Sequence, residues 1–197
     1  MDSWTRVVSG GLIVAAMTLN GVICAYGASP QRNVRRLAVA VSDYAGVDPA
    51  MLAMAERIAS DVYFRAGIKI EWVAPDGFED TGRFYVNVLS KEMAARFSAS
   101  KETVGFATPG SLAANAMYDR IREIAHDHRL PSGVILGYVM AHELGHLLLP
   151  AHSHSEMGLM KATMDLRLAA EKKLRFTRDQ AALMLERLKA PPVVSTH

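Results

Sequence analysis

The chain has 197 residues, of which 50% are hydrophobic and 21% are charged, and its formal net charge is +2 at pH 7. This length suits one domain with a sizeable core, and this composition is typical of a globular protein rather than a disordered one. Because the net charge is small and no long run of lysine or arginine occurs, the sequence favours neither nucleic-acid binding nor a polybasic membrane patch.

The first 28 residues have the features of a targeting segment. Arg6 precedes an uncharged stretch over residues 7–31, and Ala25 and Gly27 near its end have the spacing that an export peptidase reads. We therefore expect residues 1–28 to be a signal peptide and the mature protein to be exported, to the periplasm or to the extracellular space. An uncleaved membrane anchor is the alternative, because the uncharged stretch is long enough to span a bilayer.

Cys24 is the only cysteine of the chain, and it lies inside the targeting segment. The mature protein would therefore contain no disulfide, no thiolate metal ligand and no catalytic thiol. We expect residues 29–190 to form a single domain, followed by a short tail over residues 191–197.

The first half of this domain alternates strand and helix patterns. An apolar run predicts a buried strand over residues 35–41. Asp48 and Pro49 then begin a helix, as N-cap and first helical residue, and Gly67 ends it. Alternating apolar residues predict strands over residues 68–73 and 83–89, with a turn at residues 75–77 between them.

The second half begins with an irregular segment over residues 104–110. Pro109 lacks a backbone donor, so this segment belongs at a sheet edge or in a loop. A weak strand pattern follows over residues 112–118, then a helix over residues 119–128 and a longer helix from residue 130 to about residue 149. Thr177 caps a final helix that continues to about residue 188. The predicted fold class is therefore mixed α/β.

The long helix ending near residue 149 is apolar nearly all the way round, which is typical of a buried helix. Its strongly polar side chains are His142, Glu143 and His146. Burying an uncompensated carboxylate is costly, and a bound cation would compensate for it.

The spacing of these residues indicates a metal site. His142 and His146 are four residues apart, so they lie on one helical face, where a single zinc ion can bind both. Glu143, beside the first histidine, can act on a water molecule at the metal. His152 can complete the site if the chain turns back. Three protein ligands with one open position are typical of a catalytic zinc site, whereas structural sites usually have four.

The pattern formed by His142, Glu143, His146 and His152 resembles the extended zinc motif of the metzincin metallopeptidases. Leu149 stands where that family has glycine, and Met160 resembles the methionine of its Met-turn, with Met157 and Met164 as alternatives. The resemblance implies a mixed, twisted sheet packed on two long helices, one of which bears the motif. It also implies a small C-terminal subdomain with the Met-turn and a terminal helix.

The implied activity is zinc-dependent hydrolysis of peptide bonds in a peptide or protein substrate. One catalytic zinc ion would be bound by His142, His146 and His152, and Glu143 would serve as general base and then as general acid. By the same resemblance, an edge strand near residues 105–108 would pair with an extended substrate. The sequence makes no prediction of the oligomeric state.

Two alternatives remain open at this stage. In a gluzincin-like zinc peptidase, Glu171 would replace His152 as the third ligand. In the other, the chain is a catalytically inactive exported binding protein on a peptidase scaffold, although the presence of Glu143 argues against it. His154, two residues after His152, is expected to be a polar loop residue or a group that supports a ligand.

Overall fold

The structure is a computed structural model that describes residues 34–75, 83–97, 100, 102–107 and 111–189. The predicted signal peptide (residues 1–28), most of the predicted turn at residues 75–77, the segment around Pro109 and the tail (residues 191–197) lie outside the described residues. Contacts divide the chain into residues 1–31 and residues 32–197, and every element described below belongs to the second unit. None of the described helices is both long enough and apolar enough to cross a membrane.

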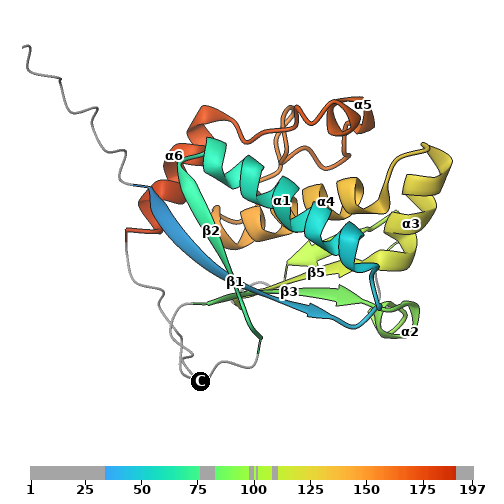
Figure 1. Cartoon of the computed structure of the whole chain (residues 1–197). Coiled ribbons are helices and arrows are strands. Elements are labelled where there is room, and N and C mark those ends of the chain that lie inside the picture. Colours follow the sequence, from blue (N-terminus) through green and yellow to red (C-terminus); the bar gives the residue numbers. More distant parts are fainter. Residues whose placement is uncertain (1–33, 76–82, 98–99, 101, 108–110, 190–197) are drawn as a thin grey trace, which may run out of the picture. The chain divides into compact units, whose positions relative to one another are not determined.

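A five-stranded sheet forms one layer of this unit (Figure 1). Its strands are β1 (Arg35–Asp43), β2 (Ile68–Val73), β3 (Phe84–Leu89), β4 (Gly105–Ala107) and β5 (Ala113–Met117). They lie in the order β2-β1-β3-β5-β4, with β4 antiparallel to β5 and the other pairs parallel. The four predicted strands are confirmed with small shifts at their ends, and the irregular segment forms the short edge strand β4.

The helix α1 (Pro49–Arg65) begins and ends where the sequence predicts. The Asp48 carboxylate accepts hydrogen bonds from the backbone N–H groups of Ala50 and Met51, at 2.9 and 3.2 Å. These bonds satisfy donors that the first helical turn leaves without a partner. After the helix, Gly67 adopts a φ of +83°, a left-handed conformation that favours glycine.

The helix α4 (Ser132–Leu148) packs against α1 and against strands β3, β4 and β5, and α1 and α4 lie on the same side of the sheet in Figure 1. Two glycines allow the helices to approach closely. A Cβ atom on Gly133 would lie 2.5 Å from the backbone oxygen of Met51, and one on Gly137 would lie 2.7 Å from that of Ala55. The all-round burial predicted for the motif helix is confirmed for most of its residues, and this packing is its cause.

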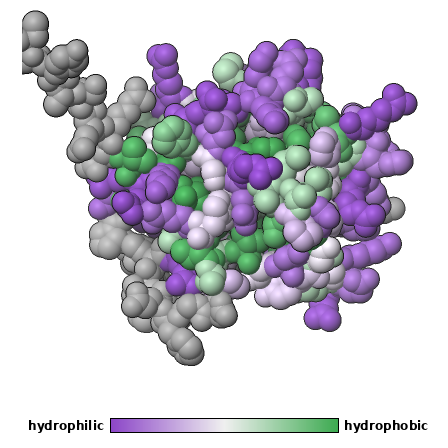
Figure 2. Space-filling view, in the orientation of Figure 1, coloured by the Kyte–Doolittle hydropathy of each residue, from purple (hydrophilic) through white to green (hydrophobic). Residues whose placement is uncertain are grey.

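The remaining helices are α2 (Lys91–Ala94), α3 (Tyr118–Asp127), α5 (Leu166–Ala170) and α6 (Arg178–Arg187). The sequence predicts α3 and α6 but not the short helices α2 and α5, which have four and five residues. In α6, Thr177 and Gln180 form a capping box, which confirms Thr177 as the cap. On the face drawn in Figure 2, hydrophilic side chains alternate with smaller hydrophobic patches.

Candidate metal centre

Two histidines of the centre come from the last two turns of α4. His142 and His146 are four residues apart, and their Nε2 atoms are 3.0 Å apart. The helix ends directly after them, with Leu149 in an extended conformation at ψ 160° before Pro150. Proline disfavours helical geometry in the residue that precedes it, and this explains the predicted helix end without the glycine of the metzincin pattern.

The third histidine of the cluster is His154. Its Nε2 atom lies 3.1 Å from that of His146, and one ring nitrogen from each of His142, His146 and His154 lies within 4.8 Å of the others. These residues form the one group in the described part of the chain that has the spacing of a metal site. Below, they are called the histidine cluster.

His152, which the sequence predicts as the third ligand, is not part of the histidine cluster. His152 is exposed and has a φ of +59°, so the backbone adopts a left-handed turn at this residue. Histidine is among the residues that tolerate this conformation best after glycine, asparagine and aspartate. This left-handed residue stands three residues after Leu149, where the metzincin pattern has glycine, and the chain returns to α4 at His154. The spacing of the histidines in the sequence does not show at which residue the chain turns back toward α4.

Both helical histidines are held by hydrogen bonds on the ring edge that faces away from the cluster. The Nδ1 atom of His142 lies 2.8 Å from the backbone oxygen of Leu159, and Nδ1 of His146 lies 3.0 Å from the Oγ atom of Ser153. A carbonyl oxygen only accepts hydrogen bonds, so Nδ1 of His142 carries the proton. In the neutral ring, Nε2 then presents its lone pair to the cluster, as metal binding requires.

The loop that bears His154 is held against the rest of the unit by several hydrogen bonds. The backbone N–H of Ser155 donates to the backbone oxygen of Met160 at 2.9 Å, and the backbone N–H of Leu159 donates to the backbone oxygen of Arg175 at 2.8 Å. The Gln180 amide of α6 donates to the Ser155 hydroxyl at 3.1 Å. The Arg175 backbone and the Gln180 side chain of α6 therefore hold the loop at two points.

Among the three candidate turn methionines, Met160 is the one that is fully buried beneath α4. Its sulfur would lie 2.8 Å from a Cβ atom on Gly145, between the two helical histidines. Met157 is 68% exposed and Met164 is partly buried. The close contact also explains the glycine at position 145, because any side chain there would meet Met160.

Glu143 is 6% exposed and points toward the edge strand β4. A Cβ atom on Gly105 would lie 2.8 Å from both Cγ and Oε1 of Glu143, so β4 passes directly over this side chain. No hydrogen bond or ion pair to the Glu143 carboxylate occurs within the described residues. Burial raises the pKa of Glu143 to about 8.

The cluster histidines on α4 are neutral at pH 7. Burial, followed by the effects of His142 and His154, lowers the pKa of His146 to about 4. Burial also lowers the pKa of His142, with a smaller opposing effect from its hydrogen bond to Leu159. Neutral imidazoles are the form that binds metal, and three imidazole nitrogens suit zinc, copper, iron or nickel. The donor set therefore fits a zinc ion.

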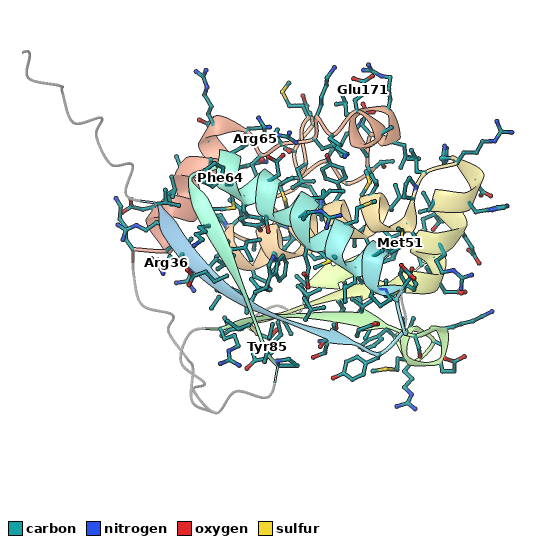
Figure 3. All side chains as sticks on the ribbon, in the orientation of Figure 1. Arg36, Met51, Phe64, Arg65, Tyr85 and Glu171 are labelled. Carbon is teal, nitrogen blue, oxygen red and sulfur yellow. The ribbon has the colours of Figure 1, made fainter. Side chains whose placement is uncertain are left out.

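Glu171, the alternative third ligand, lies outside the histidine cluster. It follows α5 directly and is labelled on that helix in Figure 3. Its carboxylate pairs with Lys173 at 2.8 Å and with Arg167 at 3.5 Å, and the hydrogen bond from Lys173 is the main cause that lowers its pKa. Glu171 is thus engaged in surface ion pairs.

The comparisons with known proteins bear on the fold. No family model matches the sequence, and no curated protein matches it. Among solved structures, the fold is similar to the crystal structure of an archaemetzincin from Methanopyrus kandleri, with a TM-score of 0.52 over 82% of this chain and 100% of that chain. The two sequences are 15% identical, so the likeness concerns the fold. The chain has an archaemetzincin-like mixed α/β fold, which confirms the predicted fold class.

Proposed function

We propose that this protein is a zinc-dependent hydrolase of peptide bonds. The observation that carries the proposal is the convergence of three Nε2 atoms, 3.0 and 3.1 Å apart in the two closest pairs, beside a buried carboxylate. Ligand nitrogens around a tetrahedral zinc ion at about 2.0–2.1 Å would be roughly 3.3 Å apart, which is close to this spacing. The archaemetzincin-like fold and the metzincin-like motif support the same function.

The ligand set of the proposal is His142, His146 and His154, which leaves one position open for substrate or water. Bare lone pairs of neighbouring neutral imidazoles repel one another, and a cation between them removes that repulsion. When bound, zinc supplies a Lewis acid that makes a water molecule acidic and polarises a carbonyl group. We assign one such ion to the centre.

Glu143 performs the proton transfers in this proposal. Its carboxylate takes a proton from the attacking water and then gives that proton to the nitrogen of the leaving amine. In the metal-free chain burial raises the pKa of Glu143 to about 8, and a cation bound nearby would favour the ionised carboxylate that accepts the proton. Gly105 leaves room for the carboxylate beneath β4, so a larger residue there would displace the reacting oxygen atoms.

The substrate in this proposal is an extended segment of a peptide or protein that lies along β4. This strand is the last of the sheet and pairs with β5 on one side, so its other edge faces no described strand. An extended peptide can add to such an edge through main-chain hydrogen bonds. Since β4 contacts the Glu143 side chain through Gly105, a peptide on this edge would pass close to the histidine cluster.

Export and the role of Met160 are further parts of the proposal. The sequence features of residues 1–28 support a signal peptide and a periplasmic or extracellular location, with a membrane anchor as the alternative. The burial of Met160 against Gly145, beneath the two helical histidines, supports its assignment as the Met-turn methionine.

The substitution Glu143→Gln tests the enzymatic proposal against the inactive binding protein. We expect the variant to retain zinc, because Glu143 is not a ligand, and to lose cleavage of a mixed-sequence peptide library by roughly 10²–10⁴-fold. Zinc content and peptide cleavage are measured on the same samples of wild type and variant. Zinc binding without cleavage in the wild type, or equal cleavage by both proteins, would contradict the proposed role of Glu143.

A further inference from the structure

Ser153 is the residue that connects the helical part of the histidine cluster to the loop part. It lies between the left-handed turn at His152 and the cluster residue His154, and it is partly buried. Its Oγ atom is 3.0 Å from Nδ1 of His146. One side chain from the loop thus contacts a helical histidine, while the next residue adds the third imidazole.

The hydroxyl and the imidazole have complementary roles in this contact. His146 must present a bare Nε2 to bind a metal, which requires the proton on Nδ1 in the neutral ring. Nδ1–H then donates to the Ser153 oxygen, which has two lone pairs available as acceptors. His142 obtains the same support from the Leu159 backbone carbonyl, so the hydroxyl of Ser153 is the side-chain counterpart of that carbonyl.

The neighbouring serine provides a contrast. Ser155 also lies in the loop, but its hydroxyl donates to the backbone oxygen of Met157 at 2.8 Å and accepts from the Gln180 amide at 3.1 Å. Among the described residues, its hydroxyl makes no hydrogen bond to an imidazole. Ser153 therefore contacts a ligand ring, whereas Ser155 contacts only groups that hold the loop.

We propose that Ser153 is a positioning residue that sets the zinc affinity of the histidine cluster. Its hydroxyl fixes the ring orientation and the tautomer of His146, and the same contact holds the loop so that His154 already faces the other two imidazoles. This inference rests on the proposed zinc-dependent function and deepens it. Groups that orient a metal-bound histidine typically change metal affinity when they are removed.

The test compares zinc affinity in wild type, Ser153→Ala, Ser153→Thr and Ser155→Ala, measured by competition with a chromophoric zinc chelator. We expect Ser153→Ala to weaken zinc binding by roughly 10- to 100-fold. Ser153→Thr restores the hydroxyl and should bind zinc nearly as tightly as wild type. Ser155→Ala, which leaves the acceptor for His146 in place, should also bind nearly as tightly. Thermal unfolding of the metal-free proteins is measured in parallel.

Each other outcome contradicts the proposal at a defined point. Wild-type affinity in Ser153→Ala would show that the hydroxyl does not support the site. If Ser153→Thr binds as weakly as Ser153→Ala, or Ser155→Ala loses as much affinity, the role of Ser153 is only to shape the loop. In all of these cases the proposed function stands as long as the wild-type protein binds zinc and cleaves peptides. A wild-type protein that does not bind zinc would overturn both proposals.

Discussion

The position of Glu143 shows how one buried side chain couples chemistry to folding. In the metal-free protein its pKa is about 8, because burial disfavours the ionised form, whereas the usual value is 4.5. The folded state therefore binds this proton more tightly than the unfolded state does. The stability gained in this way is full below about pH 4.5 and is lost as the pH rises through about 8.

This coupling predicts a pH-dependent effect of Glu143→Gln on the metal-free protein. Glutamine does not ionise, so the variant escapes the loss of stability that wild type suffers at high pH. The wild-type protein loses this stability between pH 4 and pH 9, whereas the variant does not. We therefore expect the difference in free energy of unfolding, variant minus wild type, to be larger at pH 9 than at pH 4 by on the order of 4 kcal/mol. Urea unfolding of both proteins at the two pH values measures this difference. A difference between the proteins that does not change with pH would show that Glu143 titrates normally in the fold.

The residues of the candidate centre were only partly predictable from the sequence. The spacing of His142 and His146 follows from helix geometry, and the structure brings them together with Glu143 on one helix. The third histidine depends on where the chain reverses after Pro150. That reversal occurs through the left-handed conformation of His152, and no residue pattern specified it. The sequence did offer one indication of the third ligand, because His152 and His154 are two residues apart in the segment after α4. Either of them could have been the histidine that faces α4.

At the scale of elements, the packing of α1 against α4 fixes the position of the histidine-bearing helix. The backbone oxygens of Met51 and Ala55 lie where side chains on Gly133 and Gly137 would be. Tyr63 of α1 also donates a hydrogen bond to the backbone oxygen of Ala141 at 3.1 Å, one residue before the first cluster histidine. The two helices therefore act as one support for the centre.

The substitution Gly137→Ala tests this packing, because two effects of known size oppose each other. Helix propensity alone would stabilise the protein by roughly 1 kcal/mol. The new Cβ atom would lie 2.7 Å from the Ala55 oxygen and 2.8 Å from Cβ of Ile58, both parts of a packed helix. We expect this overpacking to prevail and to lower the free energy of unfolding by about 1–3 kcal/mol. Urea unfolding measures the change, and a more stable variant would contradict the close helix contact.

Most elements were predictable because their ends carry strong local signals. Asp48 and Pro49 define the start of α1, and Thr177 defines the start of α6. The helices α2 and α5 were missed because four or five residues carry too little periodicity to be recognised. The weak strand pattern of β5 reflects its alanines, which leave space on the sheet for α4. Parallel pairing and strand order depend on long-range contacts and are not encoded in any local run.

At the scale of the whole unit, the candidate centre joins parts of the chain that are distant in sequence. The sheet and α1 support α4, the loop after α4 supplies His154, and the Leu159 carbonyl orients His142. The capping residue Gln180 of α6 contacts the same loop through Ser155. A metal ion that binds the three histidines would thus link the helix to the C-terminal part and stabilise the folded state by mass action.

The most direct test of the account is the zinc content of wild type, His154→Ala and His152→Ala, purified in parallel and analysed by mass spectrometry of the metal. We predict one zinc ion per chain in wild type, a large loss in His154→Ala and full retention in His152→Ala, because the cluster contains His154 and excludes His152. The two variants differ only in which neighbouring histidine is removed, so each controls for the other. Loss of zinc in His152→Ala with retention in His154→Ala would contradict the site described here.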